Sequence, residues 1–221
     1  MDTKLVLDFL TQLKLNNNRE WFQENKKWYE ASKKEVESFI SEMIVAISAI
    51  DPALQSPPMK DCMFRIFRDV RFGADKSPYK TNFGGFIARG GRKGLGPGYY
   101  FHFEPGECML AGGVYQPQPD TLKLLRNEVY FHSQELKDIL EKPSFKKYFA
   151  SLGDFDKMKK APKDYPADFP DIDLLKYRSY IVSQTIPDKI VISDSYKKQV
   201  LDMVKELQPL MAFLNRAISN N

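Results

Sequence analysis

The sequence predicts an α+β protein, in which a central, mainly antiparallel sheet at about residues 62–115 is flanked by N-terminal and C-terminal helices. Apolar residues recur at helical spacing before residue 51 and again after residue 120. Between these regions the spacing changes to two, and eleven of the twelve glycines lie from Gly73 to Gly113. Helices, then strands, then helices is the order typical of one α+β domain, here residues 1–221.

Two helices are expected in the first fifty residues. The first is predicted to bury Val6, Phe9, Leu10 and Leu13, and the run of three asparagines at residues 16–18 then breaks the pattern. Asn17, with Glu20 three positions on, predicts a capping box for a longer second helix. The buried stripe of that helix runs from Phe22 to Ile47, and Asp51-Pro52 ends it.

The strands follow. On the first predicted strand one face carries Phe64, Ile66, Arg68, Val70 and Phe72, and the other carries Arg65, Phe67, Asp69 and Arg71. Further strands are expected over residues 83–89, 99–104 and 108–115, with 178–185 as an additional candidate. Short strands that follow one another closely indicate an antiparallel meander.

Helical patterns return after residue 119. Asp120 is the expected cap of one helix, Ser133 of its continuation, and Pro143 is the expected first residue of a short helix. Residues 159–170, with three prolines, are expected to form an ordered surface loop. Ser193 is predicted to cap a C-terminal helix that contains Pro209.

The bulk composition narrows the class of protein. Hydrophobic residues make up 43% and charged residues 28%, as in soluble globular proteins. Cys62 and Cys108 are too few for a disulfide scaffold and lack metal-pair spacing. The first residues are unlike a signal peptide, and no apolar run is long enough to cross a bilayer. These features indicate a cytoplasmic protein with reduced thiols and no membrane association; they leave the oligomeric state open.

Four segments give the chain a recognisable signature: residues 16–22, 64–72, 75–81 and 98–106. In these segments, and again at residues 174–177, the chain resembles the proteins grouped as domain of unknown function 2461. The similarity extends over nearly the whole chain. The resemblance implies one compact domain and assigns no activity, substrate or catalytic residue.

Positive charge is concentrated beside the glycines. From Lys60 to Lys93 there are nine basic and three acidic residues, a local net charge of +6 in a chain whose total is +4. Cations next to flexible backbone predict an anion-binding site. Arg68 falls on the apolar face of its predicted strand, so its guanidinium needs a partner. The candidate ligand-binding residues are Arg65, Arg68, Arg71, Lys76, Lys80, Arg89, Arg92 and Tyr100.

His102 and Glu104 are the candidate catalytic residues. They share a strand face with Tyr100, and such a trio suits acid–base chemistry or metal ligation. His102-x-Glu104 partly matches the zinc deaminase signature, but the Pro-Cys-x-x-Cys half of that signature is absent, so no metal is expected. Residues 77–80 match Ser-x-x-Lys, but the rest of that enzyme signature is missing and a turn is the better interpretation. The chain has no phosphate loop or dinucleotide fingerprint, so no cofactor is expected.

Three interpretations remain open, as does the question of whether the protein is an enzyme. The first is a pocket for a small anionic ligand, bearing phosphate or carboxylate, with acid–base chemistry as a possible extension. The second is a single-stranded nucleic-acid-binding module, because aromatic residues such as Phe64 and Tyr79 alternate with the bases. The third is a structural protein whose arginines are paired internally with Asp69, Asp75 and Glu104. Convergence of the cations favours a small ligand, and a flat basic face favours a polymer.

Overall fold

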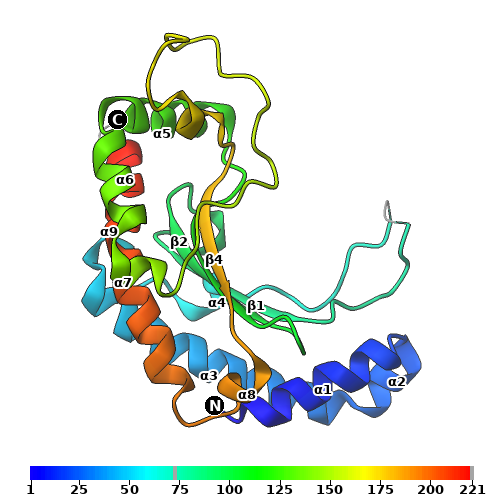
Figure 1. Cartoon of the computed structure of the whole chain (residues 1–221). Coiled ribbons are helices and arrows are strands. Elements are labelled where there is room, and N and C mark those ends of the chain that lie inside the picture. Colours follow the sequence, from blue (N-terminus) through cyan, green and yellow to red (C-terminus); the bar gives the residue numbers. More distant parts are fainter. Residues whose placement is uncertain (72–73, 220–221) are drawn as a thin grey trace.

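The computed structural model describes residues 1–71 and 74–219, and its centre is a four-stranded sheet (Figure 1). The strands are β1 (Phe83–Ala88), β2 (Gly98–Phe103), β3 (Met109–Val114) and β4 (Tyr180–Thr185). They lie in the order β1-β2-β3-β4, and each neighbouring pair is antiparallel. The antiparallel sheet with flanking helices confirms the predicted α+β class, and the 178–185 candidate is indeed the fourth strand.

Two long helices, α3 (Lys26–Ile50) and α9 (Tyr196–Ser219), pack against the sheet and against each other (Figure 1). Phe39 of α3 meets Phe101 and Phe103 of β2 edge-on, with ring centroids 5.6 Å apart in both pairs. All three rings are buried. The apolar face of β2 and the stripes of the two helices therefore form the core, as the periodicity predicts.

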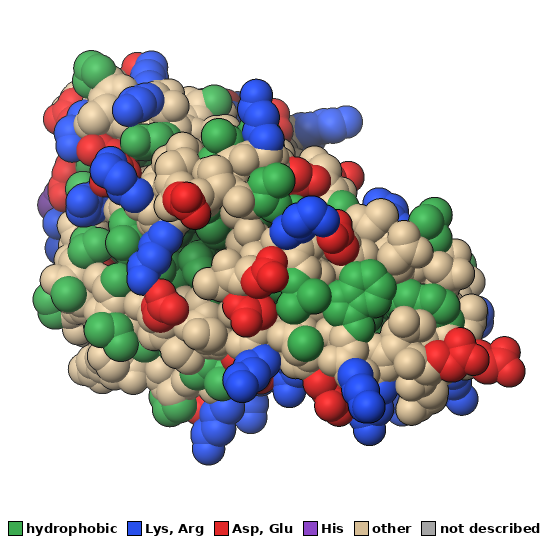
Figure 2. Space-filling model, turned by 90° about the horizontal axis from the view of Figure 1, so that it is seen from below, with side chains coloured by type: hydrophobic (Ala, Val, Ile, Leu, Met, Phe, Trp, Pro, Cys, Tyr) green, Lys and Arg blue, Asp and Glu red, His purple; other side chains and the backbone are tan. Residues whose placement is uncertain are grey.

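The remaining elements surround this core. The α-helices are α1 (Thr3–Leu15), α2 (Arg19–Glu24), α4 (Met59–Cys62), α5 (Pro119–Phe131), α6 (Ser133–Glu141), α7 (Pro143–Lys146) and α8 (Asp188–Val191). Short 3₁₀ turns are η1 (Pro52–Leu54), η2 (Gly91–Lys93) and η3 (Ile172–Lys176). Figure 2 shows the lower face of Figure 1, where α1 and α3 lie; basic and acidic side chains are mixed over it, and no large patch of one sign is seen in this view.

Several helix starts differ from those expected. Asn18, not Asn17, caps α2, because its Oδ1 accepts the N–H of Trp21 at 2.9 Å. Pro119 takes the first position of α5, so Asp120 lies within the first turn instead of capping it. Helix α9 begins at Tyr196, and the hydroxyl of Ser193 instead donates to the carbonyl of Ile190 at 2.7 Å.

The prediction of a continuous strand from residue 62 onward is wrong. Residues 59–62 form α4, and the chain after it makes single bridges, Met63 to Gly85 and Phe67 to Tyr79. From the first bridge to the second, one segment moves forward by four positions, from Met63 to Phe67, while the other moves back by six, from Gly85 to Tyr79. The register therefore shifts between the two bridges, and they do not join into a ladder. The segment is extended along the outer edge of β1, and Phe72 and Gly73 lie outside the described residues.

The two faces of β2 differ in character. Tyr99, Phe101 and Phe103 are fully buried on the helix side, whereas Tyr100 and His102 are half-buried on the opposite face. This alternation is what a strand produces when one face covers a core. Both cysteines are free and buried on the core side of the protein. Within residues 1–71 and 74–219, no helix has the length and apolar character needed to cross a membrane.

Candidate functional site

Three polar side chains form a hydrogen-bonded row along the open face of β2. The Tyr100 hydroxyl lies 2.9 Å from Nδ1 of His102, and Nε2 of His102 lies 3.1 Å from Oε2 of Glu104. Their spacing of two residues puts all three on one face, as the sequence predicts. We call Tyr100, His102 and Glu104 the polar row.

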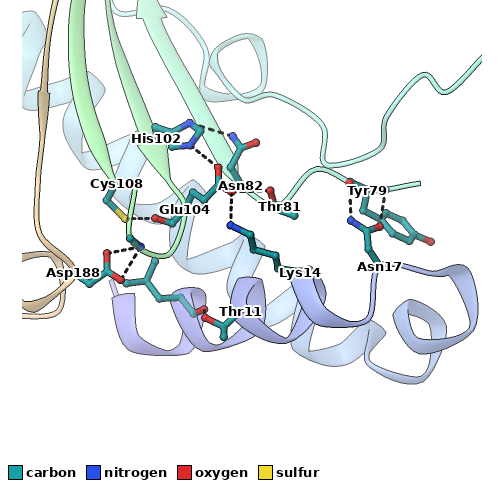
Figure 3. A network of polar contacts seen from close by, with 12 residues as sticks. Thr11, Lys14, Asn17, Tyr79, Thr81, Asn82, His102, Glu104, Cys108 and Asp188 are labelled. Atoms are coloured by element: carbon teal, nitrogen blue, oxygen red, sulfur yellow. Dashed lines mark hydrogen bonds and ion pairs between the residues drawn. The ribbon is translucent and has the colours of Figure 1, made fainter. Parts of the chain in front are cut away.

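Glu104 ends the row and is held by two segments from elsewhere in the chain (Figure 3). The Thr81 hydroxyl donates to its Oε1 at 2.8 Å, and Lys14 extends from α1 to within 3.6 Å of the same oxygen. Burial disfavours the charged carboxylate, but the hydrogen bonds from Thr81 and His102 and the positive charge of Lys14 outweigh it, so the pKa of Glu104 lies below its usual value. Glu104 is therefore an anion at neutral pH.

An ionised Glu104 fixes the tautomer of neutral His102. A carboxylate only accepts hydrogen bonds, so Nε2 of His102 carries the proton that it donates to Glu104. Nδ1 is then an acceptor, and the Tyr100 hydroxyl donates to it; the side-chain amide of Asn82 is 3.3 Å from the same nitrogen. Burial and the charge of Glu104 raise the pKa of Tyr100 to about 12, so Tyr100 keeps its proton.

Two cations lie at the ring of Phe64, and the charge of a third, Arg65, acts on one of them. Nζ of Lys80 and Cζ of Arg92 each lie 5.5 Å from the Phe64 centroid, within cation–π range. Burial lowers the pKa of Lys80, and the charges of Arg65 and Arg92 lower it further. In the described part of the chain, none of the three forms an ion pair with a carboxylate. We call Arg65, Lys80 and Arg92 the cationic cluster.

The polar row and the cationic cluster are adjacent. The edge of the Phe64 ring faces Tyr100, with centroids 6.0 Å apart and planes at 78°. Gly84 of β1 lies beneath both: a Cβ there would sit 3.0 Å from the Tyr100 hydroxyl oxygen and 3.4 Å from the Phe64 ring. The backbone N–H of Phe64 donates to the Gly84 carbonyl at 3.0 Å, which fixes the ring beside β1. A ligand above Gly84 would meet both groups.

Four of the predicted ligand-binding residues lie elsewhere. Arg68 pairs with Asp75, and Arg71 pairs with Asp69 at 2.7 Å, so these two guanidinium groups have local carboxylate partners. Lys76 donates to the Val70 carbonyl at 3.0 Å. Arg89 lines a hollow near the end of α9. The structure thus brings together Arg65, Lys80, Arg92, Tyr100, His102 and Glu104 and separates the others.

Two hollows lie apart from this site. One, of about 590 Å³, lies between the glycine-rich segment 89–97 and the end of α9, and the other, of about 560 Å³, is lined by the α1–α2 turn together with Val70, Lys76 and Pro78. Neither is lined by a member of the polar row or the cationic cluster. The candidate site is therefore defined by its hydrogen bonds and by cations that have no carboxylate partner among the described residues.

Residues that the sequence did not single out complete the site. Asn17 makes two hydrogen bonds to the backbone of Tyr79, at 3.0 and 3.2 Å (Figure 3). Tyr79 also stacks on Phe22, with ring centroids 3.9 Å apart. These contacts fix the position from which Lys80 and Thr81 reach the site. Thr81 ends one of the family-like segments, and that resemblance could have pointed to it. The contact of Lys14 with Glu104 joins residues ninety positions apart, so no local sequence pattern predicts it.

Metal ligation receives no geometric support in the described ranges. His102 and Glu104 are adjacent, but no group of three His, Cys, Asp or Glu side chains within residues 1–71 and 74–219 is arranged to hold an ion. The polar row brings together a tyrosine, an imidazole and a carboxylate, which are side chains that can take part in acid–base chemistry.

Comparison with known proteins agrees with the resemblance seen in the sequence. No curated protein and no solved structure matches the chain significantly. A family model does match, over residues 5–213, and this range contains every residue of the polar row and the cationic cluster. The chain therefore belongs to the family described as Conserved hypothetical protein (DUF2461).

Proposed function

We propose that the protein binds a small ligand bearing a phosphate or carboxylate group at the cationic cluster, and that the polar row performs acid–base chemistry on it. The observation that supports the proposal is that Lys80 and Arg92 lie at one aromatic ring, within the electrostatic reach of Arg65, and that none of the three has a carboxylate partner among the described residues. Unlike Arg68 and Arg71, these cations form no ion pair with a described carboxylate, although Arg92 donates a hydrogen bond to the Asp61 carbonyl at 3.1 Å, so their charges are available to an anionic ligand.

Electrostatics supports this assignment. Like charges at close range disfavour one another, which is why Arg65 and Arg92 help to lower the pKa of Lys80. An anion placed among the three groups would remove that repulsion. Guanidinium groups supply paired N–H donors to a phosphate or carboxylate, and an ammonium adds a point charge.

The polar row offers a route for a proton. In the neutral state Tyr100 donates to Nδ1 of His102 while Nε2–H donates to Glu104. If the ligand transfers a proton to the Tyr100 oxygen, the proton of Tyr100 passes to Nδ1, and the resulting imidazolium is stabilised by the Glu104 carboxylate. The reverse transfer returns the proton. His102 is the base in this scheme, Glu104 orients it, and Tyr100 contacts the ligand.

Binding can be tested by calorimetry with inorganic phosphate, phenyl phosphate and benzoate. Arg65→Gln and Arg92→Gln are each expected to weaken binding by about tenfold or more, because each removes charge-assisted hydrogen bonds. Arg71→Gln is the matched control: it removes the same charge from the same segment but lies in the Asp69 pair, so affinity should not change. Equal losses in all three variants, or no binding of any probe, would contradict the proposal.

The nucleic-acid interpretation makes a different prediction. A module that binds single strands should show affinity that falls steeply with salt and contributions from cations along an extended path. Two of the cations with no carboxylate partner at this site instead lie at one ring, which favours a small ligand. Tight, strongly salt-dependent binding of an oligothymidine that is lost equally in Arg65→Gln and Arg71→Gln would favour the nucleic-acid module instead.

A further inference from the structure

A second site is suggested by the glycine-rich hollow, the space of about 590 Å³ between residues 89–97 and the end of α9. Asp51, at its inner side, is 6% exposed. One carboxylate oxygen accepts the Tyr99 hydroxyl at 3.1 Å and the other accepts the Ala53 N–H at 3.2 Å. Both donors are neutral. Within the described residues Asp51 has no cationic partner, although a buried carboxylate without one is unfavourable.

The same hollow is lined by two cations. Arg89 and Lys93 are exposed, and neither forms an ion pair in the described ranges. They do not neutralise Asp51, since no ion pair joins them to it. The lining thus contains a buried carboxylate and two exposed cations, together with apolar residues such as Leu54, Leu95 and Met211.

The wall that carries Arg89 and Lys93 is fixed by glycine. Gly90 and Gly91 adopt left-handed backbone angles, φ 78° and 66°. A Cβ on Gly94 would lie 2.1 Å from the Arg89 carbonyl oxygen, so the turn closes only because that position has no side chain. The Gly94 N–H donates to the Gly91 carbonyl at 3.0 Å. This segment is a built wall and not a loose loop.

We infer that the glycine-rich hollow binds a small zwitterion of the amino-acid class, with its ammonium group at Asp51 and its carboxylate at Arg89 and Lys93. The ammonium supplies the missing counter-charge to the buried carboxylate, and the apolar lining accepts an aliphatic side chain. The site is separate from the cationic cluster: in η2, Arg92 lies over Phe64 whereas its neighbour Lys93 lines the hollow.

Three matched probes test the inference by calorimetry and ligand-observed NMR at up to millimolar concentration. Leucine carries both charges, leucine methyl ester lacks the carboxylate, and 4-methylpentanoate lacks the ammonium. Leucine should bind, and each single-charge probe should bind about tenfold more weakly or worse, because an ion pair at the hollow is lost. Failure of leucine to bind, or equal affinity for 4-methylpentanoate, would overturn it.

Variants test which residues bind the ammonium group and which bind the carboxylate of the ligand. Asp51→Asn keeps the size of the side chain, and should weaken leucine binding while leaving the residual binding of 4-methylpentanoate unchanged. Since Asp51 is buried, the exposed double variant R89Q/K93Q provides an independent test that should not affect folding; it should weaken leucine and not leucine methyl ester. Leucine affinity unchanged in both variants would refute the assignment. Arg65→Gln should leave leucine binding intact, and R89Q/K93Q should leave phosphate binding intact, so the two sites can fail separately.

Discussion

At the scale of single residues, Glu104 determines the chemistry of the polar row. Its carboxylate fixes the proton on Nε2 of His102, and this in turn makes Nδ1 the acceptor for Tyr100. The His102 and Glu104 side chains are 13% and 14% exposed, so solvent competes little for these hydrogen bonds. A neutral side chain at position 104 would leave both the tautomer and the charge of the row undetermined.

Replacing Glu104 by glutamine should therefore show a characteristic pH dependence. Because the folded-state pKa of Glu104 lies below its ordinary value of 4.5, ionised Glu104 stabilises the fold above pH 4.5, and this stability is lost as the pH falls through the folded-state pKa. Glu104→Gln should lower the free energy of unfolding by about 1–3 kcal/mol at pH 7. The difference from the unmodified protein should shrink at acid pH.

Urea denaturation from pH 3 to pH 8 would measure this dependence. Glu107→Gln is the control, because Glu107 is exposed and its side chain forms no ion pair with the described residues. Its effect should stay within about 0.5 kcal/mol at every pH. A destabilisation by Glu104→Gln that does not change with pH would show that packing, not charge, is what the glutamate contributes.

At the scale of elements, the strands were more predictable than their borders. Residues 98–103 alternate between buried and half-buried positions, and the short apolar segments 83–88 and 109–114 are separated from them by glycine or proline turns, so local pattern was enough to find all three. Residues 62–72 alternate as well, but their pairing depends on a partner segment with a shifted register, which no local pattern encodes. The caps predicted at Asn17 and Asp120 lie one and two positions from the observed ones: at α2 the adjacent Asn18 offers the same side chain, whereas Gln118, the cap of α5, makes no side-chain hydrogen bond.

The absence of a side chain at position 84 of β1 makes a specific prediction. In Gly84→Ala, the new Cβ would be 3.0 Å from the Tyr100 hydroxyl oxygen, so the Tyr100 side chain must move by a few tenths of an ångström, which perturbs its 2.9 Å contact with His102. We expect a loss of stability of about 1–3 kcal/mol and weaker binding of phenyl phosphate. Chemical denaturation and calorimetry would measure the two effects.

Gly96→Ala serves as the comparison for that substitution. A Cβ at position 96 would meet only Asn215 Oδ1, at 3.8 Å, which is an ordinary contact. Gly96→Ala should leave both stability and phosphate binding nearly unchanged. If Gly84→Ala behaves in the same way, Tyr100 is not held against Gly84 as the structure indicates.

At the scale of the whole molecule, the sequence gives the number of charged side chains but does not predict which of them form ion pairs. The excess of cations at residues 60–93 was evident, yet Arg68 and Arg71 turn to carboxylates within seven positions while Arg65 and Arg92 do not. The row at residues 100, 102 and 104 followed from strand period alone. The sites also depend on contacts between segments far apart in the sequence, made by Lys14, Phe64 and Asp51. Local sequence patterns do not predict such contacts.

The two buried cysteines allow a test of whether the protein is folded as described. Burial raises the pKa of Cys62 to about 11 and that of Cys108 to about 12, so both thiols are protonated at pH 8. In the native protein both should react with a thiol-specific disulfide reagent only as fast as the chain opens, and in denaturant both should react at once. Rapid native labelling of either residue, located by mass spectrometry, would contradict the burial seen here.

The 3₁₀ turn η2 places Arg92 and Lys93, consecutive in the chain, at two different proposed sites. A ligand that moves one of these side chains therefore acts on the same short, glycine-flanked turn that carries the other. Any resulting change in affinity must be reciprocal, because linkage gives each ligand the same influence on its counterpart. If both proposed sites bind their ligands, η2 is the element through which occupancy of one site would be felt at the other.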